Sequence, residues 1–206
     1  MRIITISREF GSGGRELGKR MADLIGFAYY DKEIIEAIAA TNKMDEAYVS
    51  EVMEKGMSRS FPITVGRTFT YPAFVQRNET KILVSQQKIV KELATRGDCI
   101  VMGQGADIIL REHYTLNLFV YADMASKIGR CKERTSADEN LSDSELKKRI
   151  KQVDAGRSNR YDLLSNSRWG AKENYHLCIN TTGVQIKTLA PQIAGYAEYW
   201  FGQEEL

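Results

Sequence analysis

The 206-residue chain is poor in cysteine and proline, and its positive and negative charges almost cancel. Its three cysteines, Cys99, Cys131 and Cys178, are odd in number, widely spaced and outside any CxxC motif. This usage excludes a disulfide framework and favours reduced, structural thiols in a cytoplasmic protein. The net charge of +2 excludes a general electrostatic attraction to nucleic acid or to an anionic membrane.

Long apolar runs and clusters of metal ligands are missing as well. No apolar stretch approaches the roughly 20 residues that cross a bilayer. The first ten residues, MRIITISREF, are typical of a strand rather than a signal peptide. The two histidines, His113 and His176, have no cysteine or carboxylate at metal-binding spacing. We therefore expect no membrane segment, no nucleic-acid partner and no metal site built from protein side chains.

What the chain does contain is a regular alternation of short apolar runs with helical patterns. Its composition, 43% hydrophobic and 27% charged, is that of a globular protein. Strands are expected at 3–6, 27–31, 99–103, 116–123 and 175–181. Such alternation predicts an α/β protein in which a parallel five-stranded sheet carries helices on both faces.

Helical periodicity fills most of the intervals between the predicted strands. The pattern predicts a long helix over 79–96 with Asn78 as its N-cap. Ser142 and Glu145 have the spacing of a capping box at the start of another long helix. A closing helix follows the last strand, and Pro191 is a point of interruption within it.

Residues 56–77 break the alternation. They hold two of the three prolines together with serine, threonine, glycine and aromatic residues. This mixture is too apolar for a disordered linker. Two interpretations remain open, a mobile flap on the substrate side or an insertion packed on the surface.

The stretch ISREFGSGGRELGKRMADLIG, residues 6–26, has the layout of a phosphate-binding loop between a strand and a helix. Its clustered glycines let backbone N–H groups turn toward an anion at the helix start. The usual G-x-x-x-x-G-K-[ST] motif is nevertheless absent. Gly14 stands where the lysine is expected, Glu16 stands where the hydroxyl is expected, and Arg15 lies between them.

Three interpretations of this loop are open. A dinucleotide site fits the first two glycines and an acid at Asp31, but Glu16 occupies the position of the third glycine. A mononucleotide site fits the length of the loop, with Arg15 or Arg8 as the cation on the phosphates. A tight turn without a ligand is the third interpretation.

Arginines on two later helices favour the mononucleotide interpretation. Arg130 and Arg134 are four residues apart and therefore share a helix face. The pattern Asp154-x-x-Arg157-x-x-Arg160 occupies about one third of the circumference of the next helix. Two arginine-bearing helices joined by a polar loop have the features of a lid that closes on a triphosphate.

The segments ITISREFGSGGRELG, YYD, IVMGQGAD, LFVYAD and LCINTT, in this order, resemble the cytidylate-kinase-like family of P-loop nucleoside monophosphate kinases. The likeness covers nearly the whole chain. It implies a three-layer P-loop kinase-like fold with a small helical lid. It also implies one domain over 1–206, with a flap or insertion at 56–77 and the lid at 130–160.

The resemblance also assigns roles to residues. The residues that it places on the nucleotide phosphates are Gly11, Ser12, Gly13, Gly14, Arg15 and Glu16. The residues that it places in catalysis are Arg15, Arg130, Arg134, Arg157 and Arg160. The residues that it places on the acceptor are Asp31, Gly103, Gln104, Asp107 and Asp154.

The implied function is ATP-dependent phosphoryl transfer to a nucleoside monophosphate, CMP or dCMP first, with Mg²⁺ as the accompanying ion. Two departures from the family pattern bear on it. The loop has no lysine, and Gln104 stands where relatives have an arginine. These departures keep a second class open, a nucleotide-binding sensor or pseudokinase without turnover. The glycines and Asp31 keep a third class open, an NAD(P)-binding oxidoreductase.

Overall fold

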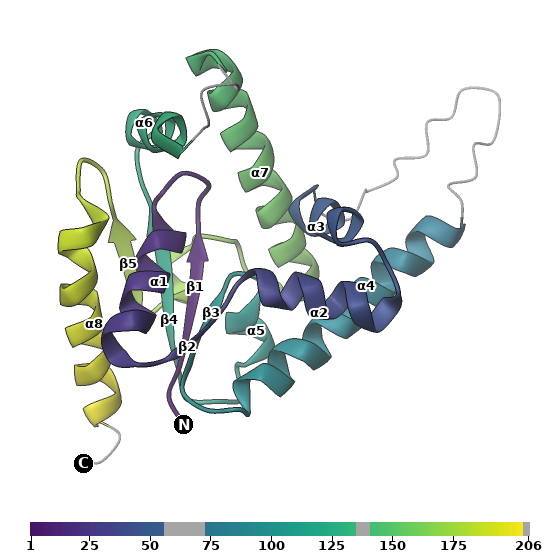
Figure 1. Ribbon diagram of the computed structural model, residues 1–206, viewed down its shortest axis with the longest axis horizontal. Helices are drawn as coiled ribbons and strands as arrows, with labels where there is room; N and C mark the ends of the chain where they lie inside the picture. Colours follow the sequence, from purple (N-terminus) through teal and green to yellow (C-terminus); the bar gives the residue numbers. More distant parts are fainter. Residues whose placement is uncertain (56–72, 135–140, 204–206) are drawn as a thin grey trace.

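The computed structural model describes residues 1–55, 73–134 and 141–203 (Figure 1). The strands in these ranges form one five-stranded parallel sheet in the order β2-β3-β1-β4-β5. Their bounds are β1 Ile3–Arg8, β2 Ala28–Tyr30, β3 Cys99–Met102, β4 Thr115–Tyr121 and β5 Leu177–Asn180. The central strand β1 is buried at every position, which agrees with the apolar run at its start, Ile3, Ile4 and Ile6. The predicted sheet is confirmed.

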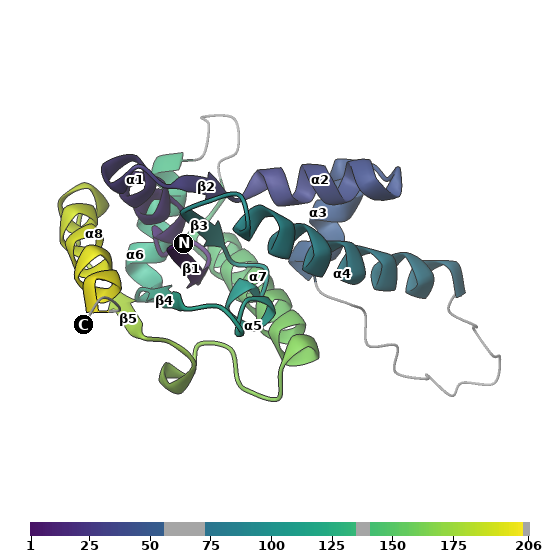
Figure 2. The same ribbon diagram turned by 90° about the horizontal axis from the view of Figure 1, so that it is seen from below.

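Helices cover both faces of the sheet, so the architecture has three layers. On one face, α1 (Gly14–Ile25) and α8 (Ile186–Gly202) pack on Ile4 and Ile6 of β1. On the other face, α2 (Lys32–Asn42), α3 (Glu46–Lys55), α4 (Ala73–Ala94) and α5 (Ala106–Ile109) form a core with Ile3. Figure 2 shows α1 and α8 on one side of the strands and α2, α3 and α4 on the other. Each face of β1 therefore belongs to a different core.

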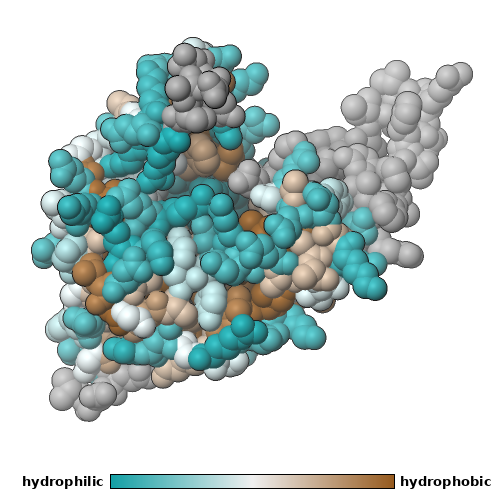
Figure 3. Space-filling view, viewed as in Figure 1, coloured by the Kyte–Doolittle hydropathy of each residue, from teal (hydrophilic) through white to brown (hydrophobic). Residues whose placement is uncertain are grey.

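Two further helices, α6 (Met124–Arg134) and α7 (Asp143–Leu164), rise beyond the carboxyl end of β1 (Figure 1). The capping box at the start of α7 is confirmed, since Ser142 Oγ accepts the N–H of Glu145 at 3.3 Å. A short 3₁₀ turn, Lys172–Asn174, precedes β5. In Figure 3 hydrophilic residues dominate the surface over α6 and the upper part of α7. The loop between β1 and α1 lies below this polar pair of helices.

Three details differ from the predicted elements. The long helix begins at Ala73 rather than after Asn78, so Asn78 lies inside α4. Pro72, next to Ala73 in the sequence, is the overlooked signal, because proline favours a helix start. The turn of helix in QGADIILREH covers only four residues, because residues 103–105 have positive φ angles that delay its start. Helix α8 continues through Pro191 without interruption.

The predicted flap at 56–77 lies mostly outside the described residues, and its last five residues, 73–77, belong to α4. Among the described helices, none combines the length and the apolar character that crossing a bilayer requires.

The packing of α1 on the sheet leads to a stability prediction. A Cβ on Gly18 would lie 2.7 Å from Met102 Sδ and 3.1 Å from Ile6 Cδ1. Overpacking a core costs roughly 1–3 kcal/mol, which exceeds the roughly 1 kcal/mol that alanine gains over glycine in a helix. We expect Gly18→Ala to lower the free energy of unfolding by about 1 kcal/mol, measured by urea unfolding.

The matched control is Gly129→Ala in α6, where a Cβ meets no atom within 4 Å. This variant gains helix propensity without a clash, so we expect it to be at least as stable as the wild type. Equal effects of the two substitutions would contradict the packing argument.

Candidate active site

The loop between β1 and α1 is shaped by two left-handed glycines. Gly11 has a φ of 78° and Gly13 a φ of 84°, backbone conformations that residues other than glycine rarely adopt. A Cβ on Gly13 would lie 2.6 Å from Ile186 Cδ1, and one on Gly11 would lie 2.9 Å from the carbonyl oxygen of Lys127. Both glycines are therefore required by the backbone and by close packing. The N-cap residue Gly13 provides no side-chain cap, and the first N–H of α1, that of Gly14, donates to Ser12 Oγ at 3.4 Å.

A cavity of about 370 Å³ lies over this loop, at the carboxyl edge of the sheet where α/β proteins bind ligands. The arginines that line it are Arg8, Arg15, Arg130, Arg134, Arg149 and Arg157. Glu9 is the acid among the described lining residues. Positive side chains around a helix N-terminus create a site for a polyanion. Of these arginines, the sequence interpretation had not singled out Arg149.

Arg130 connects the loop after β1 to the loop after β5. Its guanidinium donates to the carbonyl of Ser12 at 3.4 Å, to Thr181 Oγ1 at 3.3 Å and to the carbonyl of Val184 at 3.0 Å. Thr181 is fully buried and donates to the carbonyl of Ser12 at 2.6 Å. The first threonine of the INTT ending thus ties the last strand to the glycine loop.

Glu16 and Arg134 form a link between α1 and α6. Arg134 Nη2 lies 3.0 Å from Glu16 Oε2, and Arg20 Nε lies 2.8 Å from Glu16 Oε1. The Glu16 carboxylate is therefore bound by two arginines. Because the hydroxyl residue directly follows the lysine in the usual motif, the expected hydroxyl position is 15, held by Arg15, and the assignment of that position to Glu16 was one residue off. Both Glu16 and Arg134 remain partly exposed, at 34% and 48% of their side chains. The link can open without disturbing the core.

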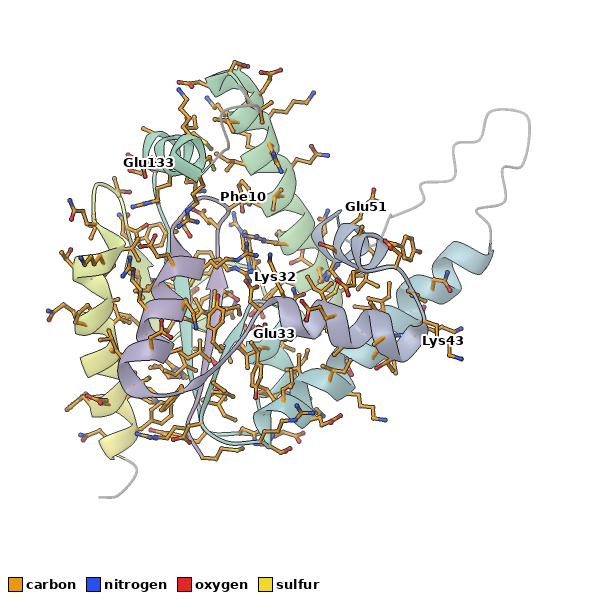
Figure 4. All side chains as sticks on the ribbon, viewed as in Figure 1. Phe10, Lys32, Glu33, Lys43, Glu51 and Glu133 are labelled. Atoms are coloured by element: carbon orange, nitrogen blue, oxygen red, sulfur yellow. The ribbon has the colours of Figure 1, made fainter. Side chains whose placement is uncertain are left out.

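A buried lysine supports the glycine loop from α6. Lys127 has 6% of its side chain exposed, and its Nζ lies 2.6 Å from Glu9 Oε2 and 3.3 Å from Asp154 Oδ2. Asp154 Oδ1 accepts the N–H of Phe10 at 2.7 Å. Figure 4 shows Phe10 on the loop after β1, below α6 and beside α7. Asp154, predicted to contact the acceptor, therefore holds the backbone of the glycine loop.

The environment of Asp154 has a visible electrostatic consequence. Burial raises the pKa of Asp154, while the N–H of Phe10 and the ammonium of Lys127 oppose that rise.

Lys127 was not predicted from the sequence, because a single lysine on a helix is usually a surface charge. Its spacing of three residues from Arg130 was the available signal, since residues three apart share a helix face.

A second, smaller cavity of about 70 Å³ adjoins the first. It contains three predicted acceptor residues, Asp31, Gly103 and Gln104, together with Arg160. Asp31 Oδ1 lies 3.1 Å from Arg8 Nη2, and Asp31 Oδ2 lies 2.6 Å from Arg15 Nε. Arg15 is thus directed at the acid that follows β2. Neither Asp107 nor Asp154 lines this cavity.

Three successive residues beyond β3 have left-handed backbones. Gly103, Gln104 and Gly105 have φ angles of 64°, 60° and 63°. This conformation is unusual for glutamine, and its cost is of the order of 1–3 kcal/mol. Gln104 Oε1 accepts from Arg160 Nη1 at 3.4 Å, and its carbonyl accepts from buried Gln86. Arg160 therefore brings positive charge to the position where Gln104 replaces the family's arginine.

Arg157 and Asp107 complete the set of predicted residues. Arg157 Nη1 donates to the carbonyl of Arg8 at 2.9 Å and lines both cavities. Asp107 is buried, with Oδ2 accepting from the hydroxyl of Tyr161 at 2.8 Å. Its Oδ1 has no hydrogen-bond partner within the described ranges. Burial raises the pKa of Asp107, against the opposing hydrogen bond from Tyr161.

Removal of the buried lysine tests its structural role. Lys127→Met leaves Glu9 and Asp154 as neighbouring acids without their shared cation, and breaking such a buried pair costs about 3 kcal/mol. We expect that loss in the free energy of unfolding, measured by urea unfolding. Lys132→Met on the same helix is the control, because its pair with Asp143 is exposed and such pairs contribute about 1 kcal/mol or less. Equal losses in both variants would refute the support role.

The raised pKa of Asp107 predicts a pH dependence of stability. The folded state keeps this proton to a higher pH than the unfolded chain, so it binds more protons between the two pKa values. The free energy of unfolding must then fall as pH rises above the ordinary pKa of 3.8, until the folded pKa is passed. We expect Asp107→Asn to lack this fall, so its stability relative to the wild type increases with pH, in urea unfolding across acidic to neutral buffers.

Asp123→Asn provides a control of opposite sign. Hydrogen bonds from Ser126 lower the pKa of exposed Asp123, so its ionisation favours the folded state as pH rises. This variant should lose stability relative to the wild type with increasing pH. A parallel trend in both variants would contradict the assignment to Asp107.

Comparison with solved structures supports the fold. A protein described as uncharacterized, from Eubacterium ventriosum ATCC 27560, aligns with a TM-score of 0.68 and 22% identity, covering 96% of this chain and 99% of that one. Shikimate kinase from Bacteroides thetaiotaomicron aligns with a TM-score of 0.57 and 15% identity, covering 96% and 98%. Shikimate kinase from Acinetobacter baumannii, in complex with shikimate, gives 0.51 and 15%, covering 94% and 90%. These likenesses establish the P-loop kinase-like fold.

Comparison with family models adds a match in sequence. No curated protein matches the chain. The model of the cytidylate kinase-like family matches residues 3–183, a span that runs from β1 to the loop after β5. Because this match covers most of the sequence and all five strands, the protein belongs to the cytidylate kinase-like family.

Proposed function

We propose that the protein transfers the terminal phosphoryl group of ATP to a small anionic acceptor, with CMP and dCMP as the first candidates. One observation carries this proposal. The two cavities adjoin, and Arg8, Arg15 and Arg157 line both of them. A phosphoryl group that passes from donor to acceptor carries charge between two such sites, and shared cations stabilise that charge.

The larger cavity suits the donor. The first N–H groups of α1 and the left-handed glycines 11 and 13 form a cradle for the phosphates, and the arginines of α6 and α7 close over it. Arg134 reaches the nucleotide by releasing Glu16, an exchange that its exposure permits. Arg130 keeps its carbonyl partners and positions the loop after β5.

The smaller cavity suits an acceptor with negative charge. Arg8, Arg15, Arg157 and Arg160 line it, against Asp31 as the acid among the described lining residues. Family membership favours a nucleoside monophosphate. The solved shikimate kinases act on a carboxylate-bearing alcohol, so shikimate belongs in the test as a second anionic acceptor. A phosphate acceptor requires no general base, which agrees with an Asp31 bound between two arginines.

Magnesium is implied by the family chemistry, but the described residues offer no ready cluster of ligands for it. Among the described residues, no group of three or more acidic, histidine or cysteine side chains converges. Position 15, where the usual motif has its hydroxyl ligand, holds Arg15, and the neighbouring Glu16 is bound to Arg20 and Arg134. Mg²⁺ coordinates readily to substrate phosphates and water. We therefore assign it to the ATP complex and no step to a protein-bound metal.

A second candidate function is nucleotide binding without turnover. The glycine at position 14 favours it, because the lysine of the usual loop stabilises the transferring phosphate. The dinucleotide alternative has less support. In the dinucleotide fold β2 pairs with β1, whereas here β3 lies between them and Asp31 is bound to two arginines.

The test is a panel of acceptors incubated with ATP and Mg²⁺, with phosphoryl transfer as the readout. The panel contains CMP, dCMP, the other nucleoside monophosphates and shikimate, and NAD and NADP binding are measured in parallel. Transfer to an anionic acceptor is the expected result. ATP binding without transfer to any acceptor would favour the sensor. Absence of ATP binding would overturn both proposals.

Two glycines at opposite ends of α1 locate the donor site. Gly13→Ala introduces a Cβ against Ile186 in a left-handed backbone, and we expect ATP affinity to fall by about tenfold or more, equivalent to about 1.4 kcal/mol. Gly26→Ala is the control, since Gly26 is also left-handed but has no atom within 4 Å of a built Cβ. Gly26→Ala should lower the free energy of unfolding and leave ATP affinity unchanged. Unchanged ATP affinity in Gly13→Ala, measured by calorimetric titration, would place the donor elsewhere.

A further inference from the structure

Counting along the glycine loop reveals a second departure from the usual motif. In G-x-x-x-x-G-K the lysine directly follows the second glycine, and the first glycine stands five residues before the second. With Gly13 as the second glycine, the lysine position is 14 and the first glycine position is 8. The chain has Arg8 where the motif has glycine, and Gly14 where the motif has lysine.

Arg8 and Gly14 pack so closely that a side chain at one position restricts the other. A Cβ on Gly14 would lie 2.7 Å from Arg8 Cβ and 3.2 Å from Val120 Cβ. Gly14 begins α1 and has no left-handed backbone, so crowding is what requires glycine there. The crowding atom of Arg8 is next to its backbone and cannot swing away. A lysine at position 14 is thus incompatible with a side chain at position 8.

A second glycine makes room for the other end of Arg8. A Cβ on Gly103 would lie 2.0 Å from Arg8 Nη1, while Arg8 Nη2 lies 3.1 Å from Asp31 Oδ1. The Arg8 side chain is 10% exposed, compared with 55% for Arg15. The guanidinium is therefore held in place from two sides, at the carboxyl edge of the sheet.

Its position is the boundary between the two cavities. Arg8 lines both of them, and its carbonyl oxygen accepts from Arg157 Nη1 at 2.9 Å. A cation that is already fixed at this boundary has no ordering cost to meet when a phosphate arrives. The more exposed Arg15 has that cost.

We propose that Arg8 is the phosphate-binding cation of this loop, and that Arg8 and Gly14 together are a reciprocal exchange of the motif's first glycine and its lysine. This inference rests on the proposed binding of ATP. In the exchanged arrangement the charge reaches the phosphates from the end of β1 instead of from the first turn of α1. The planar guanidinium also offers two parallel N–H donors where lysine offers a point charge.

The exchange is tested by reversing it in the full chain. Arg8→Gly, Gly14→Lys and the double variant are compared with the wild type in ATP affinity, turnover on the best acceptor and urea unfolding. In each single variant, ATP affinity and turnover should fall by about 100-fold, the scale of one charge-stabilising donor. The double variant restores the first glycine and the lysine of the usual motif, so it should recover most of that loss. Losses that multiply in a folded double variant would overturn the exchange.

Arg2→Gly is the matched control. Arg2 directly precedes β1 and pairs with Asp98 at 2.6 Å, at the opposite end of the strand. It tests whether losing any arginine pair near β1 lowers ATP affinity, and we expect no change. An effect as large as that of Arg8→Gly would overturn the inference.

A second comparison applies if Arg8→Gly does not fold. Arg8→Lys and Arg8→Met have side chains of similar length and differ in charge. We expect Arg8→Lys to keep ATP affinity within about tenfold and Arg8→Met to lose about 100-fold. Equal affinities would show that Arg8 only fills space.

The same measurements separate this inference from the proposed function. A wild type that binds ATP but transfers nothing removes the kinase proposal, and ATP affinity alone then decides the role of Arg8. A wild type that binds no ATP overturns both.

Discussion

Positive charge crowded at the carboxyl edge of the sheet is the constraint on which the site depends. Six arginines line one cavity, and such crowding is unfavourable unless acids lie among them. Asp31 lies between Arg8 and Arg15, and Glu16 binds Arg134. These acids neutralise the arginines in the absence of a ligand, as the negative charge of a bound ligand would do in a complex. They allow an arginine-rich edge to fold before any anion arrives.

The glycine loop is also held by a buried charge cluster around Lys127 of α6. Glu9 adds another acid beside the glycines, and Asp154 contributes its carboxylate to the N–H of Phe10. A buried cation between them prevents the two acids from repelling each other. Lys127 of α6 therefore has a structural task beside the loop, which is distinct from the phosphate-binding role of the lysine at position 14 of the usual motif.

The sequence was sufficient for the parts of the fold that follow from local pattern. Alternating strands and helices predicted the sheet, and glycines 11 and 13 predicted the turn that the backbone adopts. Contacts between distant segments could not be predicted from the sequence. The hydrogen bond from Thr181 to the carbonyl of Ser12 joins residues 169 positions apart, and nothing local marks it. The same holds for Arg149, whose place in the cavity depends on how α7 crosses the loop.

The role of Arg8 illustrates this limit most clearly. In the sequence, an arginine at the end of a buried strand and a glycine six residues later are two unrelated observations. Only the 2.7 Å approach of a built Cβ on Gly14 to Arg8 Cβ shows that the two residues share one volume. A departure from a motif is therefore best judged by asking which neighbour fills the space that the missing side chain would need.

Exposure divides the arginines into two groups with different expected behaviour. Arg8 and Arg157 are 10% and 20% exposed, so their geometry is set by the fold. Arg15 and Arg134 are 55% and 48% exposed, and each is paired with an acid. Exchanging a carboxylate partner for a phosphate costs an exposed arginine little, because exposed pairs contribute about 1 kcal/mol or less. We expect the buried pair to define where the transferring group lies and the exposed pair to close around it, so that the site gains its last contacts from the ligand itself.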